Sequence, residues 1–179
     1  KNGLGGTSTH KGCIPTKYLH SMGDIIRKAK SAKKFGINSN IEIDYSILRS
    51  RMRSIVSKLA SGIGFLFKEH GIELIEGEAS IKSQNQVIVN DRTLETKNIV
   101  LATGSKPKSF PANNLAEKIV STDSIFELED LPESILVVGG GYSGCEFASI
   151  LNALECKVWL VEMEDSLLPG QPKEVGAAI

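Results

Sequence analysis

The chain has 179 residues, 41% of them hydrophobic, so it can bury a sizeable core as one large or two small domains. Lys plus Arg and Asp plus Glu number 21 each. This balance excludes the broad basic field that holds a nucleic acid or an anionic membrane surface. There is no run of about 18 apolar residues to cross a bilayer, and the polar, Gly-rich start is unlike a signal peptide.

The three cysteines, Cys13, Cys145 and Cys156, form neither a disulfide ladder nor the CxxC pattern of a zinc site. No metal site is predicted. Their odd number suits a reducing compartment. We therefore expect a cytoplasmic protein, or one of the mitochondrial matrix if the source is eukaryotic.

Two helices are expected in the first 71 residues. Pro15 suits the first position of a helix that would run to about Lys34 and end before Gly36. Asp44 is a good N-cap for a second helix, in which apolar residues recur at helical spacing until Gly71. This second helix is long and amphipathic, so it should pack lengthwise.

The pattern then changes to short runs typical of strands. The stretches IELIEG, ASIK and QVIVN predict a small antiparallel β-meander within residues 72–90. The stretch NIVLATG predicts a buried strand over 98–104 that stops at a turn of small residues.

The proline-rich segment that follows predicts a domain boundary. Residues 107–132 carry three of the six prolines and should be mostly loop. We expect one unit over residues 1–115 and a second over 116–179. The second unit supplies strand, glycine turn, helix and strand in about 28 residues, the length of one βαβ unit.

Three glycines, Gly139, Gly141 and Gly144, form a G-x-G-x-x-G pattern between an apolar strand and a helix. The first permits a tight turn, the second the close approach of a pyrophosphate, and the third close packing of helix on strand. Glu162 ends the next strand, where it would accept hydrogen bonds from an adenosine ribose. Acids follow it and no Arg is near, so NAD is favoured over NADP. The alternative is a glycine turn in an α/β domain without a nucleotide.

The opening segment suggests thiol chemistry. Cys13 precedes Pro15 by two residues, so its sulfur would lie at the positive end of a helix, where a thiolate is favoured. Lys17 follows one turn into the same helix. A lone cysteine is more often an inert small hydrophobe and a lone lysine a solvated charge, so spacing alone leaves the choice open.

Several stretches resemble one family in the same order. LGGTSTHKGCIPTK is similar to the redox segment of the flavin disulfide reductases, whose usual form is GGTCxNxGCIPTK. LASGIGFLFKEHGIELIEG, IVLATGSKP and GGGYSGCEFA follow at intervals similar to those of dihydrolipoamide dehydrogenases, so the resemblance covers essentially the whole chain. It implies an α/β fold of partial Rossmann-like domains, with FAD bound by residues 1–115 and NAD by 116–179.

The resemblance also implies roles for single residues. Cys13 would be the flavin-proximal sulfur, and Lys17 would lie near flavin N5, paired with Glu146. Tyr142 would screen the flavin until nicotinamide enters, although a Tyr that simply packs on the turn is an equal alternative. The further positions implied to contact FAD are Gly5, Gly6, Thr7, Gly12, Ala79, Thr103, Gly104 and Ser105.

The chain departs from the family pattern at the redox segment. Ser8 occupies the position of the interchange cysteine, and a hydroxyl cannot form a disulfide with Cys13 or leave in thiol exchange. As written, the chain should not complete a thiol–disulfide cycle. His10 and Lys11 also replace the usual residues, and we expect them to be surface substitutions without a chemical role.

The resemblance places further parts of the enzyme outside this chain. A first FAD-binding βαβ unit would precede Lys1, and an interface domain that carries the catalytic His and Glu and forms the homodimer would follow Ile179. The expected activity of the parent is the oxidation of dihydrolipoamide, carried on the lipoyl domain of a 2-oxo acid dehydrogenase complex, with NAD⁺ as acceptor. The alternatives are a glutathione- or mercuric-type reductase, or a flavin- or nucleotide-binding homologue without disulfide chemistry.

Overall fold

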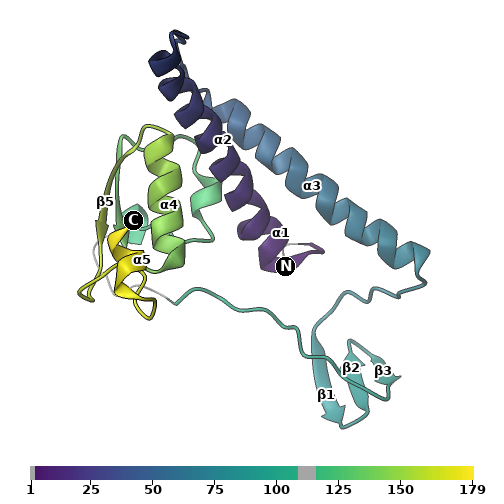
Figure 1. The fold of residues 1–179 in the computed structure, drawn as a ribbon. Coiled ribbons are helices and arrows are strands. Elements are labelled where there is room, and N and C mark those ends of the chain that lie inside the picture. Colours follow the sequence, from purple (N-terminus) through teal and green to yellow (C-terminus); the bar gives the residue numbers. More distant parts are fainter. Residues whose placement is uncertain (1–2, 109–115) are drawn as a thin grey trace.

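The computed structural model describes residues 3–108 and 116–179, which form a mixed α/β structure (Figure 1). The first part contains the helices α1 (Gly6–Lys11), α2 (Cys13–Ser31), the 3₁₀ turn η1 (Ala32–Phe35) and α3 (Tyr45–Glu69), then the strands β1 (Ala79–Ser83), β2 (Gln86–Val89) and β3 (Arg92–Glu95). The second part contains the 3₁₀ turns η2 (Ala116–Lys118) and η3 (Ile125–Glu127), then β4 (Ser134–Val138), α4 (Tyr142–Ala153), β5 (Lys157–Val161) and α5 (Lys173–Ala177).

The helix predictions are mostly confirmed, with corrections at the ends. α2 starts at Cys13 rather than Pro15, so the proline is the third helical residue, where its missing N–H still costs no helical hydrogen bond. Asp44 caps α3 as predicted, with Oδ1 accepting from the Ile47 N–H at 3.1 Å. The short helix α1 was not predicted, because its glycines favoured a turn.

The antiparallel meander is confirmed, but its strands are partly different. β1, β2 and β3 pair in that order, and the tight turn at Asn90, with φ 53°, brings β3 back along β2. Residues 72–77 form no strand, so this prediction is wrong. Arg92–Glu95 forms the third strand of the meander instead, because the two-residue turn after Val89 brings this segment alongside β2.

The predicted buried strand at 98–104 is also wrong. The segment is not paired with any described strand, and Val100 and Leu101 are 87% and 71% exposed. A strand requires a neighbour to take up its backbone hydrogen bonds and cover its side chains. Residues 98–104 therefore have the apolar pattern of a strand, but no described strand lies beside them to form a sheet.

The βαβ unit of the second part is formed as predicted. β4 and β5 pair in parallel, from Ser134 opposite Lys157 to Val138 opposite Val161, and α4 makes the crossover. Parallel sheets are normally covered on both faces. Here the outward side chains of both strands stay about half exposed, among them Leu136 and Trp159.

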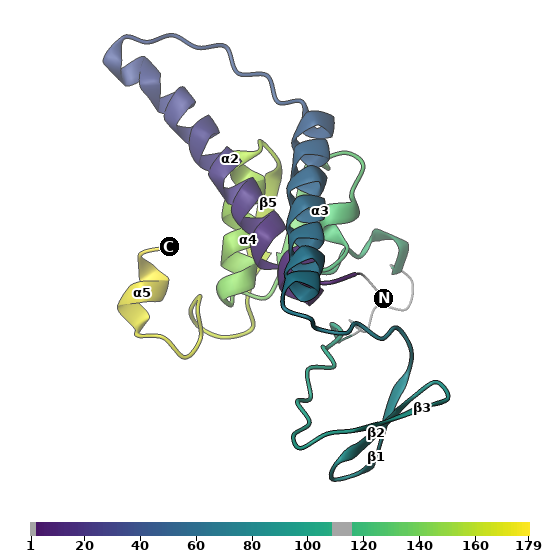
Figure 2. The same cartoon turned by 90° about the vertical axis from the view of Figure 1, so that its right-hand side faces the viewer.

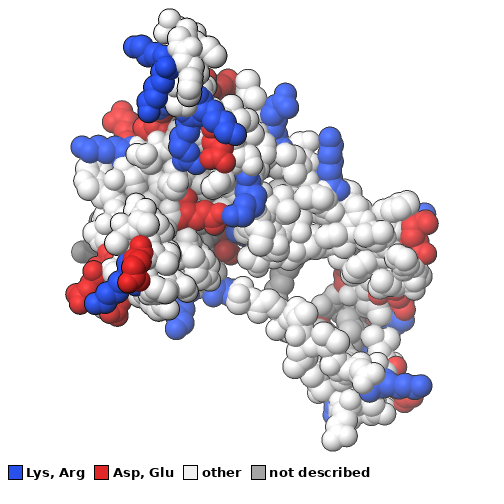
Figure 3. Space-filling view, viewed as in Figure 1, with Lys and Arg blue, Asp and Glu red and all other residues white. Residues whose placement is uncertain are grey.

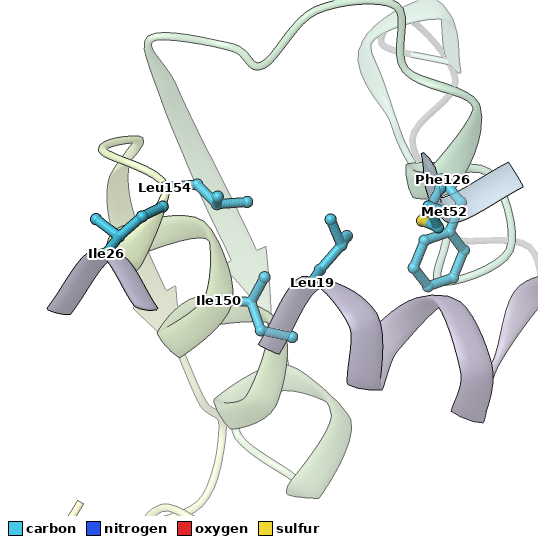
Figure 4. Close-up of a cluster of buried hydrophobic side chains, with 6 residues drawn as sticks. All are labelled: Leu19, Ile26, Met52, Phe126, Ile150 and Leu154. Carbon is cyan, nitrogen blue, oxygen red and sulfur yellow. The ribbon is translucent and has the colours of Figure 1, made fainter. Parts of the chain in front are cut away.

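The core lies where α2 meets α3, α4 and the turn η3. Figure 4 shows its six buried side chains: Leu19, Ile26, Met52, Phe126, Ile150 and Leu154. Gly23 of α2 lets this helix approach α4 closely, since a Cβ there would lie 3.0 Å from the Ala153 Cβ. This core fixes the relative position of the two helices that carry the site.

Outside this core the described residues are loosely packed and expose much of their surface. In both views the three-stranded sheet stands apart from the helices (Figures 1 and 2). The accessible surface is 13604 Å², whereas a compact monomer of 19.3 kDa exposes about 8,500 Å². Within the described residues, no helix combines the length and the apolar character that crossing a membrane requires. The predicted division after residue 115 falls beside residues 109–115, outside the described part, and stays a prediction.

Candidate functional site

The redox segment forms a short helix followed at once by a long one. Gly5, with φ 105°, precedes α1, and a Cβ there would lie 2.3 Å from Thr9 Oγ1, so this tight turn requires glycine. Gly12 separates α1 from α2, and a Cβ there would lie 3.0 Å from the carbonyl oxygen of Thr7. The backbones of the two helices therefore approach closely between Ser8 and the start of α2.

Cys13 is the first residue of α2, and its thiol is free and exposed. The positive end of this 19-residue helix favours an anionic group there. Ser8 on α1 is exposed as well, whereas Pro15 is fully buried and anchors the start of α2. Both positions of the family's cysteine pair are thus accessible, and one of them carries a sulfur.

Two neighbouring side chains tie the redox segment to its surroundings. His10 is half-buried, and one ring nitrogen lies 2.9 Å from the Leu4 carbonyl oxygen. Lys11 is half-buried too and, with Arg53 and Glu127, lines a cavity of about 360 Å³ between α1, α3 and η3. Both side chains are thus partly buried, and the expectation that they have no chemical role stays a prediction.

Lys17 and Glu146 form the ion pair that the family resemblance implies. The Lys17 Nζ donates a hydrogen bond to Glu146 Oε1, which joins the first turns of α2 and α4 across 129 residues of sequence. The hydrogen bond and the attraction of the Glu146 carboxylate raise the pKa of Lys17 above its ordinary 10.5. Lys17 is 69% exposed, so a permanent positive charge faces outward one turn from Cys13.

The two helices are parallel, which places their N-termini at one end of the molecule (Figure 1). Besides the Lys17–Glu146 pair, Arg27 Nη1 donates to the Ser149 carbonyl oxygen at 3.3 Å, and Lys30 pairs with Glu155 at 2.8 Å. Neither Arg27 nor Gly23 was identified from the sequence as a positioning residue. Only contacts between distant segments reveal them, because neither residue belongs to a motif.

The glycine turn between β4 and α4 is shaped to receive an anion. Gly139 has φ 107°, and a Cβ on Gly144 would lie 1.8 Å from the Gly139 carbonyl oxygen, so helix and turn are in direct contact. Gly141, the N-cap of α4, makes no side-chain cap, and a Cβ there would meet nothing within 4 Å. Free N–H donors and open space at a helix N-terminus fit a pyrophosphate.

Two side chains at the start of α4 define the surface of this turn. Tyr142 is 82% exposed, so the alternative in which it packs on the turn is wrong. Cys145 Sγ donates to the Gly140 carbonyl oxygen at 3.2 Å and closes the turn from inside. No role was predicted for Cys145, although its place directly after the last glycine of the motif was a usable signal.

Glu162 is held by its own chain. Its carboxylate accepts hydrogen bonds from the backbone N–H groups of Glu164 at 3.1 Å, Gly140 at 2.5 Å and Met163 at 2.7 Å. These bonds hold the pKa of Glu162 below its ordinary 4.5. A carboxylate offers about four acceptor sites, so roughly one remains for a ribose hydroxyl. The predicted ribose contact remains a prediction, while the observed role is to brace the glycine turn.

The remaining predicted FAD contacts are not gathered around Cys13. Ala79 starts β1 in the separate sheet, and residues 103–105 lie in an exposed segment without regular secondary structure. Gly6 and Gly104 have positive φ and open space at the Cβ position, as a close approach of a ligand requires. The structure therefore brings together Cys13, Lys17 and Glu146 and leaves the other FAD positions accessible but apart.

Comparisons with known proteins identify the family of this chain. The model of the family described as pyridine nucleotide-disulphide oxidoreductase matches residues 2–179. The chain is 34% identical to a dihydrolipoyl dehydrogenase of Acholeplasma laidlawii over 99% of its own length and 55% of that protein. Dihydrolipoyl dehydrogenases of Chlamydia pneumoniae and Bacillus subtilis are 35% and 33% identical over 98% of this chain and 39% and 40% of their own lengths.

The chain thus spans about two fifths to just over half of these relatives. The family match covers the redox helix and the glycine turn that the Lys17–Glu146 pair joins. We conclude that the chain belongs to the pyridine nucleotide-disulphide oxidoreductase family.

Proposed function

We propose that this chain is the part of an FAD- and NAD-dependent dihydrolipoyl dehydrogenase that contains the redox segment and contacts the cofactors. The observation that supports this most is the Lys17–Glu146 ion pair, which holds the exposed Cys13 and the glycine turn at the same end of the molecule. When bound, FAD and NAD supply the electron and hydride transfer of this family. The relatives named above bear the same activity in their names and match nearly the whole of this chain.

The protein's own residues supply binding and charge. The turn at Gly139–Gly144 offers N–H donors for the pyrophosphate of NAD, and Glu162 has one acceptor site left for a ribose. Residues 6–7 and 103–105 are exposed and fit contacts to FAD. Lys17 presents a fixed positive charge one turn from the Cys13 sulfur, which stabilises an anion formed between them.

Ser8 determines how far this chemistry can go. A thiol at position 8 would attack a disulfide and form one with Cys13, and a hydroxyl does neither. We therefore expect the whole protein to bind its cofactors and to reduce small acceptors with NADH, but not to exchange electrons with lipoamide. The partners we propose for the whole protein are dihydrolipoamide on a lipoyl domain and a second subunit.

The substitution Ser8→Cys tests this proposal, with Ser8→Ala as the matched control. In the protein expressed at the full length of its gene, Ser8→Cys should gain NAD⁺-dependent oxidation of dihydrolipoamide. The unsubstituted protein and the Ser8→Ala variant should show only reduction of a dye by NADH. Flavin absorbance should be equal in all three proteins. Equal lipoamide rates in the Ser8→Cys variant and the unsubstituted protein would refute the proposed role of position 8.

A second candidate is a flavin- or nucleotide-binding homologue without disulfide chemistry, which the native presence of Ser8 would favour. In that case Ser8→Cys gains no lipoamide activity although flavin and NADH still bind. A purified protein without flavin absorbance would exclude the dihydrolipoyl dehydrogenase and a flavin-binding homologue, and would leave only a homologue that binds a nucleotide.

A further inference from the structure

A cavity lies between α1, α3 and η3, beside the redox segment. Its volume of about 360 Å³ lies within the range of sites that hold small molecules. Two of its lining residues, His10 and Lys11, are positions at which this chain departs from the usual redox segment. Neither residue takes part in the proposed function, so the cavity is a feature beyond it.

The cavity has a net positive charge. Lys11 and Arg53 bring two positive charges, and Glu127 is the one acid in its described lining. Arg53 Nη2 donates to Glu127 Oε2 at 3.2 Å, which balances one of them. Lys11 is half-buried and forms no ion pair with a described residue, and residues 1–2 and 109–115 contain no Asp or Glu. One positive charge of the cavity is therefore not balanced by the residues that the structure describes.

Apolar side chains form the rest of the lining, with one hydroxyl. These residues are Pro15, Met52, Val56, Phe126 and Ser57. Met52 and Phe126 belong to the buried core, so this part of the wall is held in place by close packing. Val56 is half-buried and offers apolar surface to a ligand. The cavity thus combines an unbalanced positive charge with a rigid apolar wall.

We propose that this cavity binds a small organic carboxylate whose hydrocarbon part contacts the apolar wall. Lys11 supplies the charge that the carboxylate neutralises. Arg53 retains N–H donors beyond the one given to Glu127, because a guanidinium has five. His10 contributes less, because one ring nitrogen already donates to the Leu4 carbonyl oxygen at 2.9 Å. The proposal replaces the sequence-based expectation that Lys11 has no chemical role.

The charge of the cavity favours a monoanion over other small ligands. A phosphate group carries roughly two negative charges at neutral pH, whereas one positive charge is left to match. A neutral hydrocarbon would bury Lys11 further without a counter-ion, which is unfavourable. In Figure 3 blue and red side chains both occur on the helices and on the three-stranded sheet, and no broad basic field covers this face. Attraction for an anion is therefore local.

The test measures hexanoate binding to the protein expressed at the full length of its gene, by ligand-observed saturation-transfer NMR. The uncharged 1-hexanol has the same chain length and should bind about tenfold more weakly. Lys11→Gln should weaken hexanoate binding about tenfold, because it removes a charge-assisted hydrogen bond. Glu127→Gln should strengthen it roughly twofold to fivefold, because it removes the acid of the lining and releases Arg53.

Further measurements separate a site in the cavity from loose attraction by charge. Val56→Phe keeps every charge and fills part of the cavity, so it should also weaken hexanoate binding. The matched control Lys58→Gln removes an exposed lysine of α3 that does not line the cavity, and should leave binding unchanged. Hexanoate should slow the acetylation of Lys11 by acetic anhydride, measured by mass spectrometry, and not that of Lys58. Circular dichroism verifies that each variant is folded.

Several results would overturn the proposal. Absence of hexanoate binding, or equal binding of hexanoate and 1-hexanol, removes the carboxylate site. Binding that Lys11→Gln or Val56→Phe leaves intact, or that Glu127→Gln fails to strengthen, lies outside this cavity. If inorganic phosphate binds more tightly than hexanoate, the organic carboxylate is wrong. The inference depends on neither the cofactors nor Ser8, so it can fail while the proposed function holds.

Discussion

The turn between β4 and α4 allows the structural and the binding role of glycine to be separated. Gly144→Ala would place a Cβ 1.8 Å from the Gly139 carbonyl oxygen, and such contacts are essentially never found below 3.0 Å. The obstacle is backbone, so no side chain can move aside. Overpacking of this kind costs typically 1–3 kcal/mol, and we expect about 3 kcal/mol of unfolding free energy to be lost.

Gly141→Ala is the matched control three residues away. Its Cβ would meet nothing within 4 Å, and its φ of −69° is one that alanine adopts freely. This change should leave stability unchanged or raise it by up to about 1 kcal/mol, through a stiffer unfolded chain. It should nevertheless weaken NADH binding, because its methyl group occupies the open space assigned to the pyrophosphate.

The assay uses the single tryptophan of the chain as its probe. Trp159 lies on β5 opposite Leu136 of β4 and is about half exposed, so its fluorescence reports unfolding of the βαβ unit in urea. NADH affinity is measured by titration calorimetry on the folded proteins. A Gly144→Ala protein as stable as the wild type, or a Gly141→Ala protein as unstable as Gly144→Ala, would refute the reasoning.

Three other predictions concern the core and Glu162. Ile150→Ala removes a fully buried side chain of α4 and should lower the free energy of unfolding by about 3 kcal/mol, measured in urea. The control Leu136→Ala, at an exposed site, should lower this free energy less. Equal losses in the two variants would contradict the assigned core. Because the pKa of Glu162 is lowered on folding, its stabilisation is fully present above pH 4.5 and is lost as pH falls through the lower folded value. Glu162→Gln should therefore flatten this acid limb in a pH series of Trp159 fluorescence, and an unchanged slope would count against the three backbone hydrogen bonds. Glu162→Arg should shift preference towards NADPH relative to Glu162→Gln, and identical NADH-to-NADPH ratios in the two variants would remove the proposed ribose contact.

The sequence predicts best the features that depend on nearby residues. The cap at Asp44, the end of α3 before Gly71, and the strand–turn–helix–strand order of residues 134–161 follow from local chemistry and spacing, and all are formed. The Lys17–Glu146 pair was anticipated only through the family resemblance, since 129 residues separate its partners. Periodicity alone could not have paired them.

The failed predictions share one cause. Residues 72–77 and 98–104 have the apolar pattern of strands and remain unpaired, because a strand depends on a neighbour that local composition does not supply. The same reasoning explains Glu162. Its position at a strand end is readable from the sequence, but its three backbone donors come from a turn 22 residues away and from the residues that follow it.

The amino-acid sequence by itself determined the positions of the turns and helix caps, and the residue types of the redox segment and the glycine turn. These features depend on steric limits that act within a few residues. Only the tertiary structure decided that the N-termini of α2 and α4 lie at one end, that Gly23 and Arg27 hold the two helices together, and that Lys30 pairs with Glu155. These relations depend on packing between segments that are distant in the sequence. Such packing leaves no regular spacing of residues from which it could be predicted.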